Sequence, residues 1–429
     1  MKILSYQEAD FAERLAPLHR RTLPGEGLEK KVRDILKGVR EKGEEALLDY
    51  TARFDGVTLL PEQLQVSPQE LAAASMEVGS PLKQALRAAH RNVKSFALRS
   101  LRRDWKDKNE QGAVVGEIFR PIERVGIYVP GGSAPLISTA IMTVTLAKAV
   151  GCPQIVVCTP PGLDGRINPA LLHAVKLAGA TEVYRVGGAQ AVAALAHGTA
   201  SIAPVQKIFG PGNRFVVEAK RQVFGMVSID LLPGPSEIMI LSDASGDPKC
   251  LAADLLAQAE HGGDSEAVLV SSSKTLIKRV AKQIEKQSAT LSRQAQLLKV
   301  LEKGLLLVHV KNLAAGVELV NAYAPEHLTL VAKEEAKVVK EIKTAGAIFL
   351  GNDSPVACGD FLAGPSHTLP TGGAGKSFPG LTVDMFQRRT SVVKLNRAAI
   401  KKSAPLIDVL ATAEGLDAHA RSARIRLES

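Results

Sequence analysis

The stretch Val125-Gly-Ile-Tyr-Val129 is a short β-rich run that leads into a proline and two glycines. A helical pattern follows at Ser138–Val150, and a second β-rich run follows at Gln154–Cys158. A strand, a helix and a strand in this order form a βαβ unit, whose strands pair in parallel in a sheet that helices cover on both faces. These residues therefore predict an α/β fold.

The alternation continues along the chain in two sets. The first set adds a helix, a strand and a helix at Asn168–Ala178, Val183–Val186 and Ala189–His197. The second set alternates helices and strands at Lys249–Glu260, Ala267–Ser271, Lys274–Lys286, Leu305–His309, Leu313–Asn321, Leu328–Ala332, Glu334–Thr344 and Ala347–Gly351. The first hundred residues and the tail from Ala398 to Arg426 look helical. We expect two incomplete, Rossmann-like doubly wound domains with helical N-terminal and C-terminal extensions.

The length of 429 residues also favours more than one core. We expect an N-terminal helical extension at 1–25 and a first α/β domain built from 26–123 together with 237–380. A second α/β domain is expected at 124–236, and a helical tail at 381–429.

Composition excludes several classes of protein. Aromatic residues make up only 4% of the chain, which argues against a stacking surface for single-stranded nucleic acid. The net charge of +10 is spread over segments that read as amphipathic helices, so solvated helix faces explain it better than a polyanionic partner. Four cysteines without a Cys-x-x-Cys pair indicate reduced thiols, and no segment resembles a signal peptide or a membrane span. We expect a soluble, cytoplasmic protein that binds neither nucleic acid nor membrane.

The segment Ala322–Leu330 places a carboxylate, Glu326, beside an imidazole, His327, at the entrance to an apolar strand. Pro325 fixes its own φ angle and biases Ala324 toward extended geometry, so the turn should be stiff. Groups that transfer protons must be held within hydrogen-bond reach of their targets. The pair is therefore a candidate acid/base site, and a surface Glu-His dipeptide is the alternative.

Three glycine-bearing turns follow predicted strands: 130–133, 187–190 and 209–213. Ligands of α/β sheets bind at the carboxyl ends of the strands, where glycine lets the backbone approach a phosphate. None of the turns spells Gly-x-Gly-x-x-Gly. They permit dinucleotide binding, but each could equally serve a tight turn.

Gln258 and His261 have the i, i+3 spacing that puts two side chains on one helix face. Histidine is a common zinc ligand but glutamine is a poor one, so the pair alone is more typical of a satisfied helix end. Asp360, His367 and His419 are the candidates for further ligands. A set of Gln258, His261, Asp360 and His419 would form an open zinc site.

Taken together, these motifs resemble those of the histidinol dehydrogenase family. The resemblance covers nearly the whole chain and is carried, in order, by Gly126-Ile-Tyr-Val-Pro-Gly-Gly132, Val186-Gly-Gly-Ala-Gln-Ala191, Gly210-Pro-Gly-Asn213, Pro233-Gly-Pro-Ser-Glu237, Gln258-Ala-Glu-His-Gly262, Ala324-Pro-Glu-His327, Gly364-Pro-Ser-His-Thr-Leu-Pro370 and the tail segment Glu414–His419. Together these motifs are highly specific, although each alone is not.

The resemblance implies the oxidation of L-histidinol to L-histidine through an enzyme-held aldehyde, with two NAD+ reduced per turnover and one zinc per site. It implies Glu326 and His327 as the catalytic acid/base pair and Gln258, His261, Asp360 and His419 as zinc ligands. Tyr128, Gln190 and Asn213 would contact NAD. The substrate would lie among Ser236, Gln258, His261, Glu326, His327, Asp360, His367, Glu414 and His419.

The family's enzymes are homodimers in which the C-terminal segment reaches into the partner's site. The resemblance thus assigns zinc and catalysis to the first α/β domain, NAD to the second, and Glu414 and His419 to the other subunit's site. Three alternatives remain. The first is a related zinc- and NAD-dependent dehydrogenase of another polyol or hydroxy acid. The second is a zinc hydrolase, for which the glycine turns around Tyr128, Gln190 and Asn213 would have no purpose. The third is a nucleic-acid-binding protein, against which the dispersed charge and the few aromatic residues count.

Overall fold

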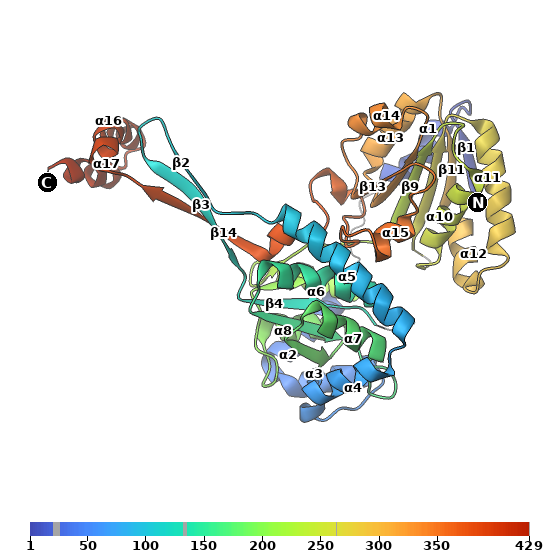
Figure 1. The fold of residues 1–429 in the computed structure, drawn as a ribbon, viewed down its shortest axis with the longest axis horizontal. Coiled ribbons are helices and arrows are strands. Elements are labelled where there is room, and N and C mark those ends of the chain that lie inside the picture. Colours follow the sequence, from blue (N-terminus) through green and yellow to red (C-terminus); the bar gives the residue numbers. More distant parts are fainter. Residues whose placement is uncertain (20–25, 132–134, 263, 429) are drawn as a thin grey trace.

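The computed structural model describes residues 1–19, 26–131, 135–262 and 264–428. They form two α/β units and a long arm that extends from the point where the units meet (Figure 1). Both units contain a parallel sheet, and helical segments flank them. The fold class expected from the sequence is therefore confirmed.

The first unit is a six-stranded parallel sheet in the order β1-β11-β10-β9-β12-β13. Its strands are β1 (Lys2–Ser5), β9 (Glu237–Ser242), β10 (Glu266–Ser271), β11 (Leu305–His309), β12 (His327–Val331) and β13 (Ala347–Leu350). Its helices are α1 (Phe11–Leu15), α10 (Pro248–Ala259), α11 (Lys274–Ser288), α12 (Gln294–Lys303), α13 (Leu313–Tyr323), α14 (Glu335–Glu341) and α15 (Val356–Phe361). Separate apolar cores cover the two sheet faces, as expected of a parallel sheet.

The second unit is a five-stranded parallel sheet in the order β6-β5-β4-β7-β8. Its strands are β4 (Arg124–Tyr128), β5 (Gln154–Thr159), β6 (Glu182–Arg185), β7 (Lys207–Phe209) and β8 (Ser228–Ile229). Its helices are α2 (Glu26–Lys42), α3 (Glu44–Phe54), α4 (Pro68–Glu77), α5 (Ser80–Ser100), α6 (Ile137–Val150), α7 (Pro169–Ala178), α8 (Gly188–His197) and α9 (Arg214–Val223).

The packing differs from the division expected from the sequence. Residues 26–100 were grouped with the first unit, but their helices pack on the five-stranded sheet: α2 and α3 lie against α8 and α9, and α4 and α5 lie against α6 and α7. The N-terminus was expected to be a helical extension, yet β1 pairs with β11 as an edge strand of the first sheet. Sequence periodicity gives a helix its apolar face but does not say which sheet that face covers.

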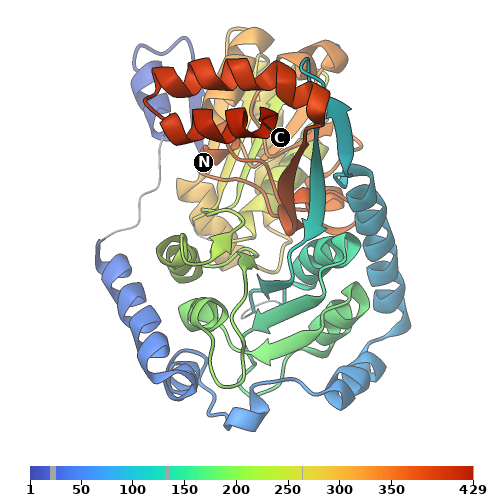
Figure 2. The ribbon, with the colours of Figure 1, turned by 90° about the vertical axis from the view of Figure 1, so that its left-hand side faces the viewer.

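The arm is a three-stranded antiparallel sheet that carries the C-terminal helices. Its strands, in the order β14-β3-β2, are β14 (Gln387–Lys394), β3 (Val114–Pro121) and β2 (Trp105–Lys108), and its tip holds α16 (Arg397–Ala413) and α17 (Asp417–Arg424). Figure 2 shows α16 and α17 side by side in front of the molecule. At the base of the arm, the ring of Phe386 stacks on that of Phe209 with centroids 3.8 Å apart. The strands were missed in the sequence because most of their side chains are partly or fully exposed.

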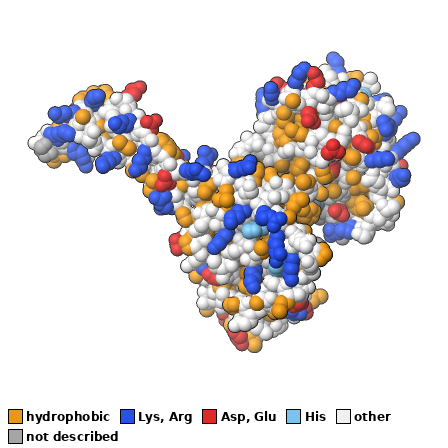
Figure 3. All heavy atoms as spheres, viewed as in Figure 1, with side chains coloured by type: hydrophobic (Ala, Val, Ile, Leu, Met, Phe, Trp, Pro, Cys, Tyr) orange, Lys and Arg blue, Asp and Glu red, His pale blue; other side chains and the backbone are white. Residues whose placement is uncertain are grey.

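The surface agrees with the expected solvated charge. Lys and Arg side chains gather over α5 and along the arm, which stands away from both units (Figure 3). None of the helices in the described part of the chain is long and apolar enough to cross a membrane.

A fully buried ion pair links α9 to the segment after β8. Lys220 and Asp230 contact each other, and both side chains are 0% exposed. Lys220 Nζ also donates to the carbonyl of Gly210 at 2.9 Å, and Asp230 Oδ2 accepts from the N–H of Gly210 at 2.8 Å. The pair therefore fixes both backbone groups of Gly210, at the turn after β7.

We predict that Lys220→Met lowers the free energy of unfolding by about 3–5 kcal/mol, because it leaves the carboxylate of Asp230 buried without its counter-charge. Urea unfolding measures this loss. The matched control is Lys337→Met, which removes an exposed ion pair with Glu334 and should cost no more than about 1 kcal/mol. Equal losses of unfolding free energy in the two variants would show that the buried pair contributes no more to stability than the exposed one.

Candidate active site

Glu326 ends the turn between α13 and β12, and His327 is the first residue of β12, which lies between β9 and the edge strand β13. Glu326 is 6% exposed and His327 is 4% exposed, so the surface-dipeptide alternative is wrong. The expected extended geometry of Ala324 is also wrong: its φ angle is 57°, in the left-handed region. Ala324 ends α13 there and donates its N–H to the carbonyl of Val320 at 2.8 Å. Non-glycine residues in this region are strained and concentrate at functional sites.

The backbone of Glu237 holds both members of the pair. Because β12 pairs in parallel with β9, the start of β9 lies beside the turn. The N–H of Glu237 donates to Glu326 Oε2 at 2.8 Å, and His327 Nδ1 lies 3.1 Å from the carbonyl of Glu237. A carbonyl can only accept, so Nδ1 carries the proton and Nε2 is the free ring nitrogen when His327 is neutral.

Burial sets the proton affinity of the pair. It raises the pKa of Glu326 to about 7, against the opposing charge of His327 and the hydrogen bond from Glu237. Burial alone would lower the pKa of His327, but the charges of Glu326 and Asp360 together raise it to about 9. The two groups lie 3.6 Å apart, Nδ1 to Oε2, so their titrations are coupled and they form an ion pair when Glu326 is ionised and His327 is protonated.

Asp360 and His367 join this site from the segment after β13. Asp360 Oδ1 lies 3.5 Å from His327 Nε2. His367 Nδ1 lies 2.9 Å from the carbonyl of Asp360, and its Nε2 lies 3.1 Å from Thr139 Oγ1 on α6. Burial lowers the pKa of His367. His367 therefore connects the segment of Asp360, beside His327, to the second unit.

Gln258 and His261 lie at the C-terminal end of α10. Gln258 is 3% exposed, and its Nε2 has no hydrogen-bond partner among the described residues. His261 is exposed, yet its charge contributes to holding the pKa of Asp360 below its usual value, so it lies near that carboxylate. Within the described ranges, no three His, Cys, Asp or Glu side chains are close enough to hold a metal.

Two of the predicted residues are not brought to this site within one chain. Glu414 and His419 are exposed side chains at the end of α16 and in α17, at the tip of the arm. Figure 1 shows this tip far from α10, α15 and β12.

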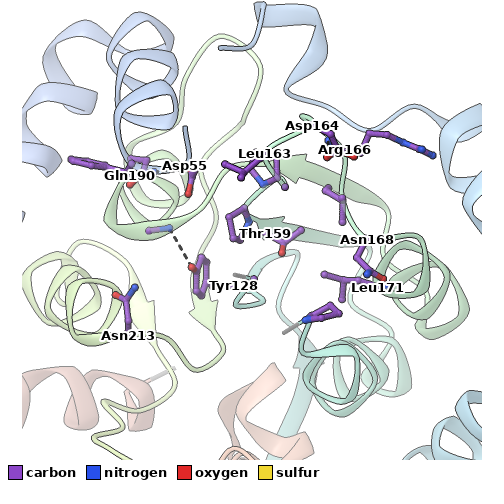
Figure 4. Close-up of a pocket in the computed structure, with 18 of the residues that line it drawn as sticks. Asp55, Tyr128, Thr159, Leu163, Asp164, Arg166, Asn168, Leu171, Gln190 and Asn213 are labelled. Atoms are coloured by element: carbon purple, nitrogen blue, oxygen red, sulfur yellow. Dashed lines mark hydrogen bonds between the residues drawn. The ribbon is translucent and has the colours of Figure 1, made fainter. Parts of the chain in front are cut away.

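Tyr128, Gln190 and Asn213 line one cavity of about 860 Å³ in the second unit (Figure 4). Tyr128 ends β4, Gln190 lies in the first turn of α8, and Asn213 caps α9 by accepting from the N–H groups of Phe215 and Val216. The hydroxyl of Tyr128 accepts from the N–H of Gly188 at 3.2 Å. Helix N-termini thus meet at the carboxyl ends of the strands, where α/β sheets bind ligands.

The glycine turns have specific roles in this cavity. Gly210 has a φ angle of 108°, and a Cβ there would lie 2.1 Å from the carbonyl oxygen of Tyr128. Only glycine fits this position. Gly131 lines the cavity, whereas residues 132 and 133 of the 130–133 turn lie outside the described residues.

Two further residues with important contacts were not selected from the sequence. Glu237 belongs to the segment Pro233–Glu237, but its contacts with Glu326 and His327 are made by its backbone. Any residue type has these backbone groups, so the sequence does not reveal them. Asp55 follows α3 and lines the cavity beside Gln190 (Figure 4). An aspartate at a helix end is common, and only the packing of α3 on α8 brings it to the cavity.

Ser236 directly precedes Glu237, and its carbonyl accepts from the N–H of Glu266 at 3.0 Å. It lies in the link between the two units. The structure therefore places Ser236, Glu326, His327, Asp360 and His367 around the start of β9 and β12, and it places Tyr128, Gln190 and Asn213 in the neighbouring unit.

The chain is similar to known proteins over its full length. A sequence profile of the histidinol dehydrogenase family matches residues 18–427. Histidinol dehydrogenase from Syntrophotalea carbinolica is 43% identical over 429 residues, covering 100% of this chain and 99% of the relative. The enzyme from Synechococcus sp. is 43% identical and covers 94% and 92% of the two chains.

Solved structures agree. A crystal structure of histidinol dehydrogenase from Elizabethkingia anophelis superposes with a TM-score of 0.95 at 34% identity, covering 100% of this chain and 98% of that one. An acetylating aldehyde dehydrogenase from Geobacillus thermoglucosidasius shares the fold alone, with a TM-score of 0.51 at 15% identity. Because the profile and the 43% identical relatives cover nearly all of the sequence, the chain belongs to the histidinol dehydrogenase family of oxidoreductases.

Proposed function

We propose that the protein oxidises L-histidinol to L-histidine through L-histidinaldehyde, with NAD+ as oxidant, as the last steps of histidine biosynthesis in the cytoplasm. Family membership supports the substrate. The observation that carries the chemistry is the buried Glu326–His327 pair, whose two side chains are both held by the backbone of Glu237. Proton transfer groups that are fixed in this way are suited to two successive oxidations at one carbon.

In the first oxidation, His327 in its neutral form takes the proton of the substrate hydroxyl while the carbon gives up hydride. The charge of Asp360 is one of those that raise the pKa of His327, so coordination of Asp360 to zinc would lower that pKa and favour the neutral form. The hydrogen bond of Nδ1 to Glu237 leaves Nε2 to accept this proton. The neighbouring carboxylates of Glu326 and Asp360 stabilise the imidazolium that forms. Bound NAD+ would supply the hydride acceptor for this step. The product is the aldehyde.

The second oxidation needs water to add to the aldehyde. Glu326 acts as the general base: it removes a proton from the water as the oxygen bonds to the carbonyl carbon. Its pKa near 7 is suited to this step, because a base works best when its pKa lies near the working pH. The resulting hydrate loses a hydride, for which a second NAD+ would be the acceptor, together with a hydroxyl proton, and becomes the carboxylic acid. Burial keeps the aldehyde from bulk water between the two steps.

The residues at the end of α10 fit a zinc ion. Gln258 is buried with its amide Nε2 unpaired, and turning the amide over would place the oxygen, the atom that binds zinc, at that position. Burial opposes the charge on Asp360, but the hydrogen bond and charge of His327 hold its pKa below the usual value, so Asp360 is ionised. We propose Gln258, His261 and Asp360 as ligands from one chain and His419 as the fourth. Zinc would bind and orient the imidazole and amine of the substrate, because it has no redox chemistry of its own. Ser236, His367 and Glu414 would contact the same substrate.

A homodimer would bring the fourth ligand to the site. α16 exposes Leu406, Val409 and Leu410 at 53%, 68% and 65%, on an arm that stands away from both units (Figures 1 and 3). Exposed apolar side chains grouped on one helix mark an interaction surface. We therefore propose that the arm packs on a second copy and delivers Glu414 and His419 to the partner's site.

The first test is the yield of NADH when zinc-loaded protein meets limiting L-histidinol and excess NAD+. Two NADH per histidinol are expected, followed by absorbance at the NADH band, and the yield should be lost after treatment with EDTA. One NADH would contradict the second oxidation and indicate a simple alcohol dehydrogenase. If no NADH forms with histidinol but another polyol or hydroxy acid is oxidised, that compound replaces histidinol as the proposed substrate.

A second prediction concerns Glu326. Glu326→Gln should slow oxidation of L-histidinaldehyde by roughly 10²–10⁴, because it removes the general base, while it leaves NAD+ binding within about twofold. Single-turnover kinetics with the aldehyde separate this step from the first oxidation. The control is Glu334→Gln, at an exposed residue that pairs with Lys337. An unchanged rate in Glu326→Gln would remove its role as base.

A third prediction concerns the arm. Glu326→Gln and His419→Asn should each be nearly inactive alone, but an equimolar mixture that is unfolded and refolded together should recover about a quarter of the wild-type activity. Half of the dimers would be mixed, and each mixed dimer would contain one site with both residues intact. An inactive mixture would mean that His419 serves the site of its own chain.

A further inference from the structure

Asp55 lies in the cavity of the second unit and has no role in the chemistry proposed above. It ends α3, where its N–H donates to the carbonyl of Thr51 at 2.9 Å. Figure 4 shows Asp55 next to Gln190, with its carboxyl group directed into the cavity above Tyr128. The carboxylate of Asp55 is half-buried, so it needs hydrogen-bond donors from the protein to replace the water that it has lost.

The donors come from the N-terminus of α8. Gln190 Nε2 donates to Asp55 Oδ2 at 3.3 Å, and the backbone of Gly187 also hydrogen-bonds to the carboxylate. A Cβ at Gly187 would lie 3.1 Å from Asp55 Oδ1, so glycine allows this close approach. α3 and α8 are thus joined by a polar contact inside an otherwise apolar interface.

Gln190 is left with one unsatisfied atom. Its side chain is 1% exposed, and its Oε1 has no hydrogen-bond partner among the described residues. A buried amide oxygen without a donor is costly, and its cost is removed when a ligand supplies one. Gln190 lines the same cavity as Tyr128 and Asn213.

We propose that Asp55 is a positioning residue that holds the Gln190 amide with Nε2 toward itself and Oε1 toward the cavity, where Oε1 accepts a hydrogen bond from a hydroxyl or amide N–H of the dinucleotide. The inference rests on the proposed use of NAD+. A glutamine amide has nearly the same shape in both orientations, so only its partners decide which end faces the ligand. An ionised carboxylate can accept but not donate, and it therefore selects one orientation.

The ionisation of Asp55 agrees with this role. Burial raises its pKa to about 6, and the hydrogen bonds from Gly187 and Gln190 oppose that rise. The carboxyl group is therefore mostly ionised at neutral pH and acts as an acceptor only. The remaining charge on the cavity wall comes from side chains at its rim, such as Asp164 and Arg166.

The test is calorimetric titration of NAD+ into the purified, full-length protein without histidinol. Asp55→Ala should weaken binding about tenfold, because Gln190 then samples both orientations. Asp55→Asn retains an acceptor of the same shape and should recover part of that loss. The matched control is Asp49→Ala on the same helix, which removes an exposed ion pair with Arg53 and should leave the affinity within about twofold.

The decisive comparison uses Gln190. If Asp55 acts through Gln190, the double variant Asp55→Ala/Gln190→Ala should bind NAD+ as weakly as Gln190→Ala alone. The KM for NAD+ should rise in Asp55→Ala while kcat at saturating NAD+ stays unchanged. Equal affinities of Asp55→Ala and wild type would overturn the inference. So would a loss that persists in the Gln190→Ala background, because Asp55 would then contact the ligand itself. Wild-type protein that binds no NAD+ would instead overturn the dinucleotide assignment.

Discussion

The parallel pairing of β9 with β12 is the constraint on which the candidate active site depends. It brings the first peptide groups of β9 beside the turn before β12, so that a single residue, Glu237, can donate to Glu326 and accept from His327. The pairing that forms the sheet therefore also holds the two side chains next to each other, as the proposed proton transfer requires.

Burial shifts the pKa values of the two members in opposite directions, upward for Glu326 and downward for His327. It disfavours the charge on Glu326 and on His327 alike, but each group also provides the opposite charge that the other needs. The outcome is a carboxyl group whose pKa lies near neutrality, next to an imidazole that binds its proton tightly. Asp360 adds a second negative charge on the far side of the ring. The site therefore stabilises the protonated form of His327, which is the form that results when His327 removes a proton from an alcohol.

The helices and strands, and the position of Glu326 and His327 at the start of a strand, could be predicted largely from sequence, because they depend on residues that are close together in the chain. Alternating β-rich and helical runs gave the α/β class, and the ranges predicted between Gln154 and Gly351 agree with the observed elements to within a few residues, although α9, α12, β8 and β9 in the same stretch were not predicted. The position of Glu326 and His327 before a strand predicted an acid/base pair; the two side chains are buried together there, and their role stays a prediction. The other failures depend on contacts between distant segments. The pairing of β1 with β11, the packing of α2 to α5 on the second sheet and the antiparallel arm have no local signature. The left-handed Ala324 shows the same limit, since the proline rule describes the usual geometry and the C-terminus of α13 imposes another.

The arm explains why the candidate metal ligands do not converge within one chain. An antiparallel ribbon has to bury at least one face to be stable, and most side chains of β2 and β14 are exposed here. Its tip adds exposed apolar residues on α16 and the charged side chains of α17. A segment of this kind loses conformational entropy on folding without burying enough apolar surface to offset the loss. Docking on a second copy would supply that burial and would place Glu414 and His419 beside residues of another chain. Folding of the arm, assembly and completion of the zinc site would then be a single process, because each supplies the contacts that the others lack.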